Sequence, residues 1–253
     1  MNIQIGTSGY SFDSWEGIFY PPGLAPKDRL SFYARHFGVV EINATFYGLL
    51  SPAVFSSMAE KTHEGFGFVV KANRKTTHER RDVEVAGRFR EAVWPLIEAG
   101  QFEGVLAQFP WSFRNTPVNQ AYLTACRERM GALPYFAEFR HQSWLAPGVQ
   151  ELLQRNQIGF VCVDEPQIGG MMPPVIQATT NTGYIRLHGR NAKSWWGPGP
   201  RYDYLYSLQE LKGWGQKAKA LDGQTQKTFL FFNNCHVGQA VKNAQVLQRM
   251  LEL

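Results

Sequence analysis

The chain has 253 residues, of which 44% are hydrophobic and 19% are charged, and 26 Lys and Arg against 21 Asp and Glu give a net charge of +5. This composition is typical of a folded globular protein and excludes a disordered, collagen-like or membrane-embedded chain. The length suits one large barrel or two small domains. Because no linker or composition shift divides the chain, we predict a single domain over residues 1–253.

The cysteines and the first residues indicate the cellular compartment. Three cysteines without a short repeated spacing argue against a disulfide framework and a cysteine-based zinc site. The opening MNIQIGTSGY lacks the basic and apolar regions of a signal peptide, and no apolar run approaches the roughly 18 residues that span a bilayer. We expect a cytoplasmic protein without a membrane partner; the oligomeric state stays open.

Short segments rich in β-branched and aromatic residues alternate with longer polar or amphipathic stretches. Eight strands separated by helices predict a parallel sheet with helical crossovers, and at this length the closed (β/α)8 TIM-type barrel with long βα loops is the simplest fold class. The alternative is an open doubly wound sheet. The expected strands are 2–8, 39–45, 67–73, 104–109, 135–140, 159–164, 183–188 and 228–233.

Capping residues and apolar stripes predict the helices. Ser51 before Pro52 and Thr116 before Pro117 each resemble an N-cap followed by the first helical residue. Residues 165–182, which contain two glycines and two prolines in a short run, look too broken for a full helix. The remaining expected helices contain residues 85–96, 149–153, 204–218 and 237–251.

Polar residues share one parity in several expected strands, and they cluster late in each strand. In a barrel this places them inside the carboxyl-terminal mouth, where active sites of this architecture lie. A buried ion-pair network is the alternative, but it explains only part of the set, and ionised groups gather at functional sites. The residues are Glu41, Asn43, Lys71, Asn73, Gln108, Glu138, Arg140, Asp164, Arg186, His188 and Arg190.

Six of these residues are the catalytic candidates. The carboxylates of Glu41, Glu138 and Asp164 are candidates for proton transfer, with His188 as a partner near neutral pH. Lys71 and Arg186 would neutralise developing negative charge. Asn43 and Arg140 are candidates for ligand binding at the same mouth.

Five of the seven tryptophans follow expected strands, namely Trp15, Trp111, Trp144, Trp195 and Trp196. We expect them at the rim of the mouth, where Trp144, Trp195 and Trp196 would stack on a nucleobase or a sugar ring. The alternative is that such rings pack the long loops against the barrel.

The loops after the last two strands predict a phosphate site. Arg190 supplies charge there, Asn233 and Asn234 supply amides, and the last helix presents its N-terminus nearby. The alternative is that Asn234 or His236 caps that helix without a ligand. The segment 192–203 is long enough to act as a lid.

The chain lacks the short sequence motifs of several common classes of catalytic site. The chain has no phosphate loop, dinucleotide fingerprint, HExxH zinc motif or GxSxG elbow. No cofactor is predicted; a divalent metal held by Glu138, Asp164, His188 and His236 is the weaker alternative, because basic neighbours compete for those carboxylates. A glycosidase would have to pair Glu41 with Glu138 or Asp164.

Several motifs resemble the YecE-like proteins, a family labelled as a domain of unknown function (family 72). The resemblance implies a TIM-like β/α barrel and brings no accepted reaction; a likeness to metal-dependent nucleases of the endonuclease IV type has been proposed for some members. The matching stretches are IGTSGYSFDSWEGIFYP from Ile5, VEINATFYGL from Val40, Lys71 with Thr77-His78, LAQFPWSF from Leu106, EFRHQSW from Glu138, IRLHGRN from Ile185 and FFNNCHVGQAVKNAQVL from Phe231.

Three functions are compatible with these patterns. The first is binding of a phosphorylated, ring-bearing ligand, such as a nucleotide or nucleic-acid segment, with hydrolysis of its phosphoester. The second is a non-catalytic nucleic-acid-binding protein, which predicts a steep salt dependence of affinity. The third is a sugar-active enzyme of the glycosidase or sugar-phosphate isomerase type.

Overall fold

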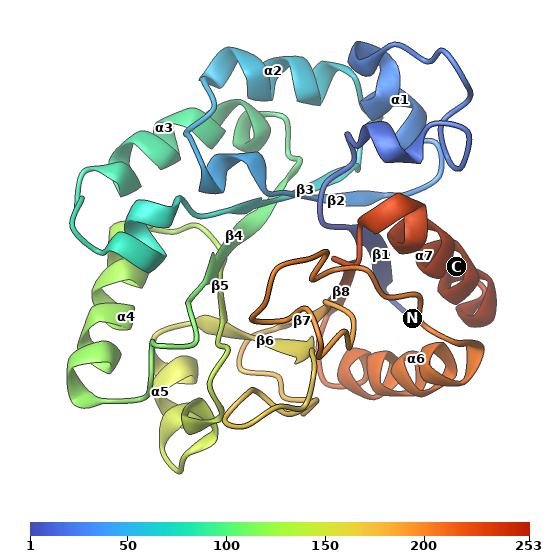
Figure 1. Cartoon of the computed structure of the whole chain (residues 1–253). Coiled ribbons are helices and arrows are strands. Elements are labelled where there is room, and N and C mark those ends of the chain that lie inside the picture. Colours follow the sequence, from blue (N-terminus) through green and yellow to red (C-terminus); the bar gives the residue numbers. More distant parts are fainter.

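The computed structural model describes residues 1–253, and all eight strands join one parallel sheet in the order β1-β8-β7-β6-β5-β4-β3-β2. The sheet curves into a barrel with the helices outside it (Figure 1). The predicted TIM-like barrel is confirmed, and the open doubly wound sheet is wrong. The strands are β1 (Ile3–Thr7), β2 (Val39–Ile42), β3 (Gly67–Lys71), β4 (Phe102–Gln108), β5 (Tyr135–Glu138), β6 (Ile158–Asp164), β7 (Thr182–Leu187) and β8 (Lys227–Phe232).

Both predicted caps precede a helix, but only Thr116 makes a side-chain capping hydrogen bond, and Ser51 makes none. Thr116 accepts a hydrogen bond from the Asn119 amide at 3.2 Å, and Ser207 forms a capping box with Glu210. The short helix α1 carries no clear signal in the sequence, and residues 166–181 contain no helix, as predicted. The helices are α1 (Arg29–Tyr33), α2 (Pro52–Glu60), α3 (Val85–Glu98), α4 (Pro117–Arg129), α5 (Val149–Arg155), α6 (Leu208–Asp222) and α7 (Gln239–Leu251). None of them has the length and apolar character needed to cross a membrane.

A tyrosine closes the barrel between its first two strands. A single bridge, between Ser8 and Glu41, joins β1 directly to β2. Below it, the fully buried hydroxyl of Tyr33 accepts a hydrogen bond from the Thr7 amide at 2.9 Å and donates one to the Val39 carbonyl at 3.2 Å. The side chain thus replaces ladder hydrogen bonds that the two backbones do not make with each other.

Removing this hydroxyl tests the closure. We expect Tyr33→Phe to lower the free energy of unfolding by about 1–3 kcal/mol, because the Thr7 amide is left buried without a partner. Urea denaturation measures the difference. Tyr47→Phe is the matched control, since Tyr47 is 79% exposed and its hydroxyl makes no hydrogen bond in the protein. Equal stability of the two variants would contradict this role.

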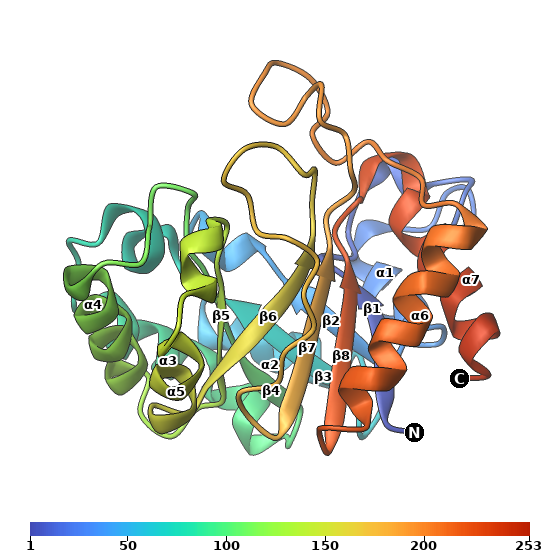
Figure 2. The same ribbon diagram turned by 90° about the horizontal axis from the view of Figure 1, so that it is seen from below.

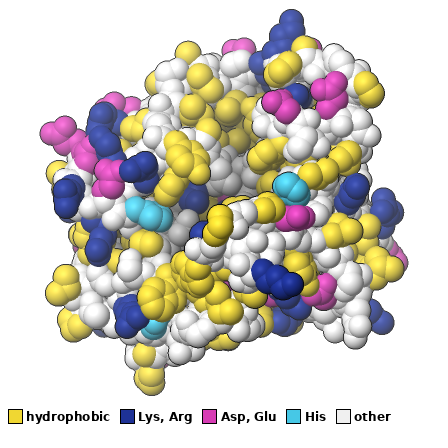
Figure 3. Space-filling view, viewed as in Figure 1, with side chains coloured by type: hydrophobic (Ala, Val, Ile, Leu, Met, Phe, Trp, Pro, Cys, Tyr) yellow, Lys and Arg dark blue, Asp and Glu magenta, His cyan; other side chains and the backbone are white.

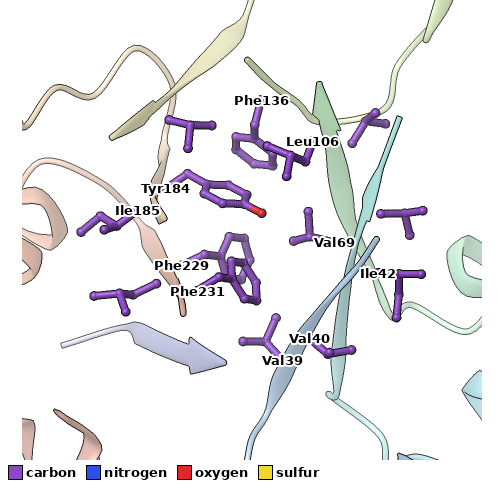
Figure 4. Packing of buried hydrophobic residues seen from close by; sticks show 14 of the residues in the cluster. Val39, Val40, Ile42, Val69, Leu106, Phe136, Tyr184, Ile185, Phe229 and Phe231 are labelled. Atoms are coloured by element: carbon purple, nitrogen blue, oxygen red, sulfur yellow. The ribbon is translucent and has the colours of Figure 1, made fainter. Parts of the chain in front are cut away.

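Aromatic side chains fill the lower half of the barrel interior (Figure 4). The ring centroid of Tyr184 lies 4.9 Å from that of Phe136 and 5.3 Å from that of Phe231. Two positions after Phe136, Tyr184 and Phe231, the inward residues Glu138, Arg186 and Asn233 are polar, and the Tyr184 hydroxyl donates a hydrogen bond to Glu41 at 2.7 Å. An apolar layer therefore supports an ionic layer near the carboxyl ends of the strands.

Candidate functional site

A cavity of about 480 Å³ opens at the carboxyl ends of the strands, and its volume is typical of small-molecule sites. Figure 3 shows this face of the molecule hollowed near its centre, with hydrophobic side chains around the opening. The segment between β7 and α6 rises above the same end of the barrel (Figure 2). Four cationic side chains line the cavity and no Asp or Glu does; the cations are Lys71, Arg140, Arg186 and Arg201.

Arg186 is the centre of a buried ionic cluster directly beneath the cavity. Its Nε donates a hydrogen bond to Glu41 at 2.8 Å and its Nη2 donates another at 2.6 Å, so the pair is bidentate. Its Nη1 donates to Glu138. None of these three side chains is more than 1% exposed. The structure thus brings together three residues predicted to share the barrel interior.

Arg140 and His188 extend this cluster. The Arg140 Nε lies 2.6 Å from Glu138 Oε1, and the His188 Nε2 lies 3.2 Å from the same oxygen. Burial lowers the pKa of His188 to about 3, so the ring is neutral. Its Nδ1 accepts a hydrogen bond from the Asn233 amide at 2.9 Å, which places the ring proton on Nε2, facing Glu138.

The two carboxylates and the histidine lie below the floor of the cavity. Glu41, Glu138 and His188 are fully buried and are absent from the cavity lining, whereas both cluster arginines reach it. Burial alone would raise the pKa of Glu138, but Arg140 and Arg186 hold it well below its usual range. All three side chains lie beneath the arginines and have no direct access to a ligand.

Asp164 lies on the opposite face of β6 from the one predicted. Its carboxylate accepts two hydrogen bonds from the Arg190 Nε, at 2.9 and 3.1 Å, and it does not line the cavity. The next residue, Glu165, takes the inward position and accepts a hydrogen bond from Arg140 Nη1 at 2.7 Å. The parity prediction fails here because the inward residues of β6 are the apolar Val161 and Val163.

The predicted phosphate corner is not assembled. Arg190 is paired with Asp164 and also donates to Glu210 at the start of α6, at 3.0 Å. Asn234 is fully buried, and its amide donates to the Tyr204 carbonyl at 2.8 Å and to Asn243 Oδ1 at 2.9 Å. Both side chains therefore anchor the loop that precedes α6. Asn43 and Asn233, in contrast, line the cavity as predicted.

The tryptophans divide into two groups. Trp111, Trp195 and Trp196 line the cavity. Trp144 does not; it is 1% exposed, stacks on Phe139 at 4.2 Å between ring centroids and donates its indole hydrogen to the Phe113 carbonyl at 2.6 Å. Trp15 is also fully buried. Trp144 and Trp15 therefore pack loops against the barrel, as the alternative predicted, because both rings are buried and both indole N–H groups are hydrogen-bonded within the protein.

Lys71, at the end of β3, is a buried cavity cation without a carboxylate partner. Its Nζ donates a hydrogen bond to Gln108 Oε1 at 3.0 Å and lies 4.5 Å from the centroid of the Phe46 ring. Burial, followed by repulsion from Arg186, lowers the pKa of Lys71 to about 7. His78 lines the same cavity, and burial lowers its pKa to about 4. The cavity therefore contains a titrating amine beside a neutral imidazole.

Acid titration tests the protonation state of the buried Glu165 side chain. Burial raises the pKa of Glu165 to about 7, although Arg140 opposes the shift, so the folded state keeps a proton that the unfolded chain loses above about pH 4.5. His188 acts in the opposite sense, because below about pH 6.5 only its unfolded form binds a proton. On acidification from pH 6.5 to 4.5, Glu165 therefore adds stability and His188 removes it.

Glu165→Gln removes the stabilising contribution of Glu165. On acidification through this window, we therefore expect the free energy of unfolding to fall more steeply in the variant than in the parent chain, by about 1.4 kcal/mol per pH unit. Urea denaturation of the variant and the parent chain at three pH values across the window gives the two slopes. Parallel slopes would show that Glu165 is ionised in the folded protein and would contradict the prediction.

The four residues considered for a metal do not converge. Glu138 and His188 face each other, but Asp164 is bound to Arg190, and the His236 Nε2 lies 3.8 Å from Asp203. No group of three or more His, Cys, Asp or Glu side chains is arranged to hold an ion.

Several cavity residues were not among the predicted site residues, although Phe46 and His78 lie in stretches that carry the family resemblance. Phe46 lies in a short 3-10 turn after β2, and His78 lies in a single π-helical turn, Lys75–Glu79, of a kind that recurs at functional sites. Arg201 stacks over Trp195 and Trp196 at 5.3 and 5.9 Å. The one available signal for Arg201 is its place in the Gly-Pro-rich segment already expected to be a lid.

Comparison with known proteins identifies relatives along the whole chain. A family model described as "Protein of unknown function DUF72" matches residues 4–253. The UPF0759 protein YunF of Bacillus subtilis (strain 168) is 34% identical over 273 residues, which cover 99% of this chain and 95% of YunF. The UPF0759 protein YecE of Escherichia coli (strain K12) is 31% identical over 155 residues, 59% of this chain and 52% of YecE.

Solved structures agree with this assignment. A DUF72 family protein from Thermotoga maritima, at 39% identity, superposes with a TM-score of 0.93 over the full length of both chains. One from Enterococcus faecalis, at 27% identity, gives 0.89 over 99% of this chain and 96% of its own. SacUVDE, at 9% identity and a TM-score of 0.58 over both full chains, shares the fold. The chain therefore belongs to the DUF72 (UPF0759) family of TIM-like barrels, as its YecE-like motifs predicted.

Proposed function

We propose that this protein binds a phosphorylated, ring-bearing small molecule, such as a nucleotide, in the cavity at the carboxyl-terminal mouth. The observation that carries the proposal is the composition of the lining, which contains four cationic side chains and several aromatic rings but no Asp or Glu. A cavity of this kind favours a ligand that is anionic at one end and flat at the other.

The cations supply donors that the protein itself leaves unused. The Arg140 Nη1 donates a hydrogen bond to Glu165 and its Nε forms an ion pair with Glu138, whereas its Nη2 has no partner in the protein. Arg201 is exposed and contacts only indole rings. Because the Arg140 guanidinium is locked in place by Glu138 and Glu165, it offers a donor of fixed orientation to an incoming phosphate oxygen.

Aromatic side chains line the cavity beside the cations. The rings that line the cavity are Phe12, Phe46, Tyr47, Trp111, Trp195, Trp196 and Tyr202. Trp196 is 61% exposed, with its ring centroid 6.1 Å from that of Trp111. An exposed indole beside a second indole provides a face on which a nucleobase or sugar ring can stack.

Two neutral polar groups in the lining have no partner. The Asn43 Oδ1 and the Trp111 Nε1 are shielded from solvent and make no hydrogen bond within the protein. Such groups cost about 1–3 kcal/mol each when unpaired, so a ligand that supplied one donor and one acceptor would recover this energy.

Binding is better supported than hydrolysis or glycoside cleavage. Both reactions need a carboxylate or another base in contact with the ligand or its attacking water. Glu41 and Glu138 are held by Arg186 beneath the floor, and Asp164 faces Arg190 on the outside of β6. The titrating group that faces the cavity is the Lys71 amine.

Calorimetric titration with AMP, ribose 5-phosphate and adenosine tests the proposal. We expect AMP to bind more tightly than either fragment, because it alone supplies both the phosphate and the ring. Arg201→Ala and Trp196→Ala should each weaken AMP binding by about tenfold. Arg88→Ala is the control, because this arginine is outside the cavity lining and should leave affinity unchanged.

The same titrations distinguish a nucleic-acid binder. If a single-stranded oligonucleotide binds while AMP does not, with an affinity that falls steeply as salt increases, the ligand is a polyanion and the small-molecule proposal is wrong. Failure of adenosine, ribose 5-phosphate and AMP alike, with no effect of either cavity variant, would also overturn it.

A further inference from the structure

Lys71 differs from the other cationic residues at the ionic floor. Arg186 and Arg140 each contact two carboxylates, whereas no carboxylate oxygen lies within 4.0 Å of the Lys71 amine. Its one hydrogen-bond partner is the neutral amide of Gln108, and its other neighbour is the face of Phe46. A lysine placed to balance charge would sit against Glu41 or Glu138, and this one does not.

The surroundings of the amine favour its uncharged form. Burial is the largest effect, and it lowers the pKa of Lys71 to about 7. Arg186 on β7 and Arg140, two residues after the end of β5, disfavour a further positive charge, whereas Glu138 and Glu41 favour one. The uncharged, nucleophilic form of the amine is therefore accessible near neutral pH. An amine of this kind at the floor of an anion-binding cavity can react covalently with an electrophilic ligand.

We propose that the ligand carries an aldehyde or ketone group besides its anionic group, and that Lys71 captures this carbonyl as an imine. The inference rests on the proposed function, because the arginines must hold the anionic group for the carbonyl to reach the amine. It names the substrate class more closely: a small anionic carbonyl compound.

Imine formation between Lys71 and the carbonyl group is a condensation that releases water. The nitrogen lone pair of Lys71 attacks the carbonyl carbon, the carbonyl π electrons move to oxygen, and that oxygen takes a proton while the nitrogen loses one, giving a carbinolamine. The hydroxyl then leaves as water after a second protonation, and the C=N bond forms. His78 is neutral and lines the same cavity, so it is placed to relay these protons.

Pyridoxal 5′-phosphate is a suitable probe, because it is a phosphorylated, ring-bearing aldehyde whose imines absorb visible light. Borohydride adds hydride to the imine carbon and leaves a stable secondary amine, which peptide mass spectrometry locates. We expect Lys71 to be labelled at least tenfold faster than Lys75, which is paired with Asp82 on the surface. Inorganic phosphate should slow labelling at Lys71 and leave Lys75 unaffected.

Two variants and a pH series make the test decisive. Lys71→Met and Lys71→Arg should both abolish the rapid absorbance change. The Lys71→Met variant should have a thermal midpoint at least as high as that of the parent chain, because a costly buried charge is removed. The labelling rate at Lys71 should rise with pH around a midpoint near 7. Labelling of Lys71 no faster than that of Lys75, with pyridoxal 5′-phosphate and with pyruvate alike, would overturn the proposal.

Other probes separate this inference from the proposed function. Pyruvate with borohydride offers a carboxylate in place of a phosphate. If pyruvate labels Lys71 and phosphorylated aldehydes do not, imine capture stands and the phosphate assignment fails. If AMP binds and no carbonyl probe labels Lys71, the proposed function stands and imine capture is wrong.

Discussion

Replacing Arg186 with methionine is expected to lower the free energy of unfolding by about 3–5 kcal/mol, which is among the largest effects of a single substitution in a folded domain. Arg186 is 1% exposed and is the bidentate partner of Glu41 as well as a partner of Glu138. Methionine fills a similar volume but leaves Glu41 without any cationic partner and Glu138 with Arg140 alone. The loss comes from uncompensated buried charge rather than from a cavity.

Urea denaturation at neutral pH measures this effect, with Arg88→Met as a control. Arg88 forms an exposed ion pair with Asp82, and loss of such a pair changes stability by less than about 1 kcal/mol. Adding Glu41→Gln to Arg186→Met should restore part of the loss, since it removes the unpaired charge. A loss below about 1 kcal/mol for Arg186→Met would show that the cluster is not held together by charge.

Substituting Gly6 by alanine is expected to cost about 3 kcal/mol or more, because the barrel is closed at this position by close backbone contact. A Cβ on Gly6 would lie 2.2 Å from the carbonyl oxygen of Val39 and 3.2 Å from the Phe231 ring. The backbone of β2 cannot yield without loosening the hydrogen bond that Tyr33 donates to the same oxygen. The strain therefore falls on the junction between β1 and β2.

Thermal and chemical denaturation of Gly6→Ala would be compared with Gly87→Ala. Gly87 lies inside α3, and a Cβ there meets no atom within 4 Å, so alanine should stabilise the protein by up to about 1 kcal/mol. Opposite signs for the two substitutions are the expected result. A mild effect at Gly6, similar to that at Gly87, would mean that the junction is loosely packed.

The barrel was predictable because strand and helix signals are local. Alternation within β2, β3, β5 and β7 identifies the inward residues, since each strand has apolar residues on the outer face, against the helices, and polar residues on the inner face. The same argument fails for strand β6, because all seven of its residues are buried and apolar residues occupy its inward positions. Parity then assigns Asp164 to the interior and overlooks Glu165.

The pairing of the charges could not be predicted, because it depends on contacts between distant residues. Arg190 and Arg186 look alike in the sequence, four positions apart near the end of one strand. One turns inward to Glu41, which is 145 residues away, and the other turns outward to Asp164 and Glu210. Similarly, Trp144 and Trp195 both follow strands, and only the packing of neighbouring loops decides which ring reaches the cavity.

The segment between β7 and α6 contributes Trp195, Trp196, Arg201 and Tyr202 to the cavity, whereas the ionic floor comes from the strands themselves. The outer part of the cavity and its ionic floor are thus encoded in separate stretches of chain. Exchanging this one segment between relatives would change the outer part of the lining and leave the floor intact. One barrel can therefore vary in this loop while the packing of its interior stays the same.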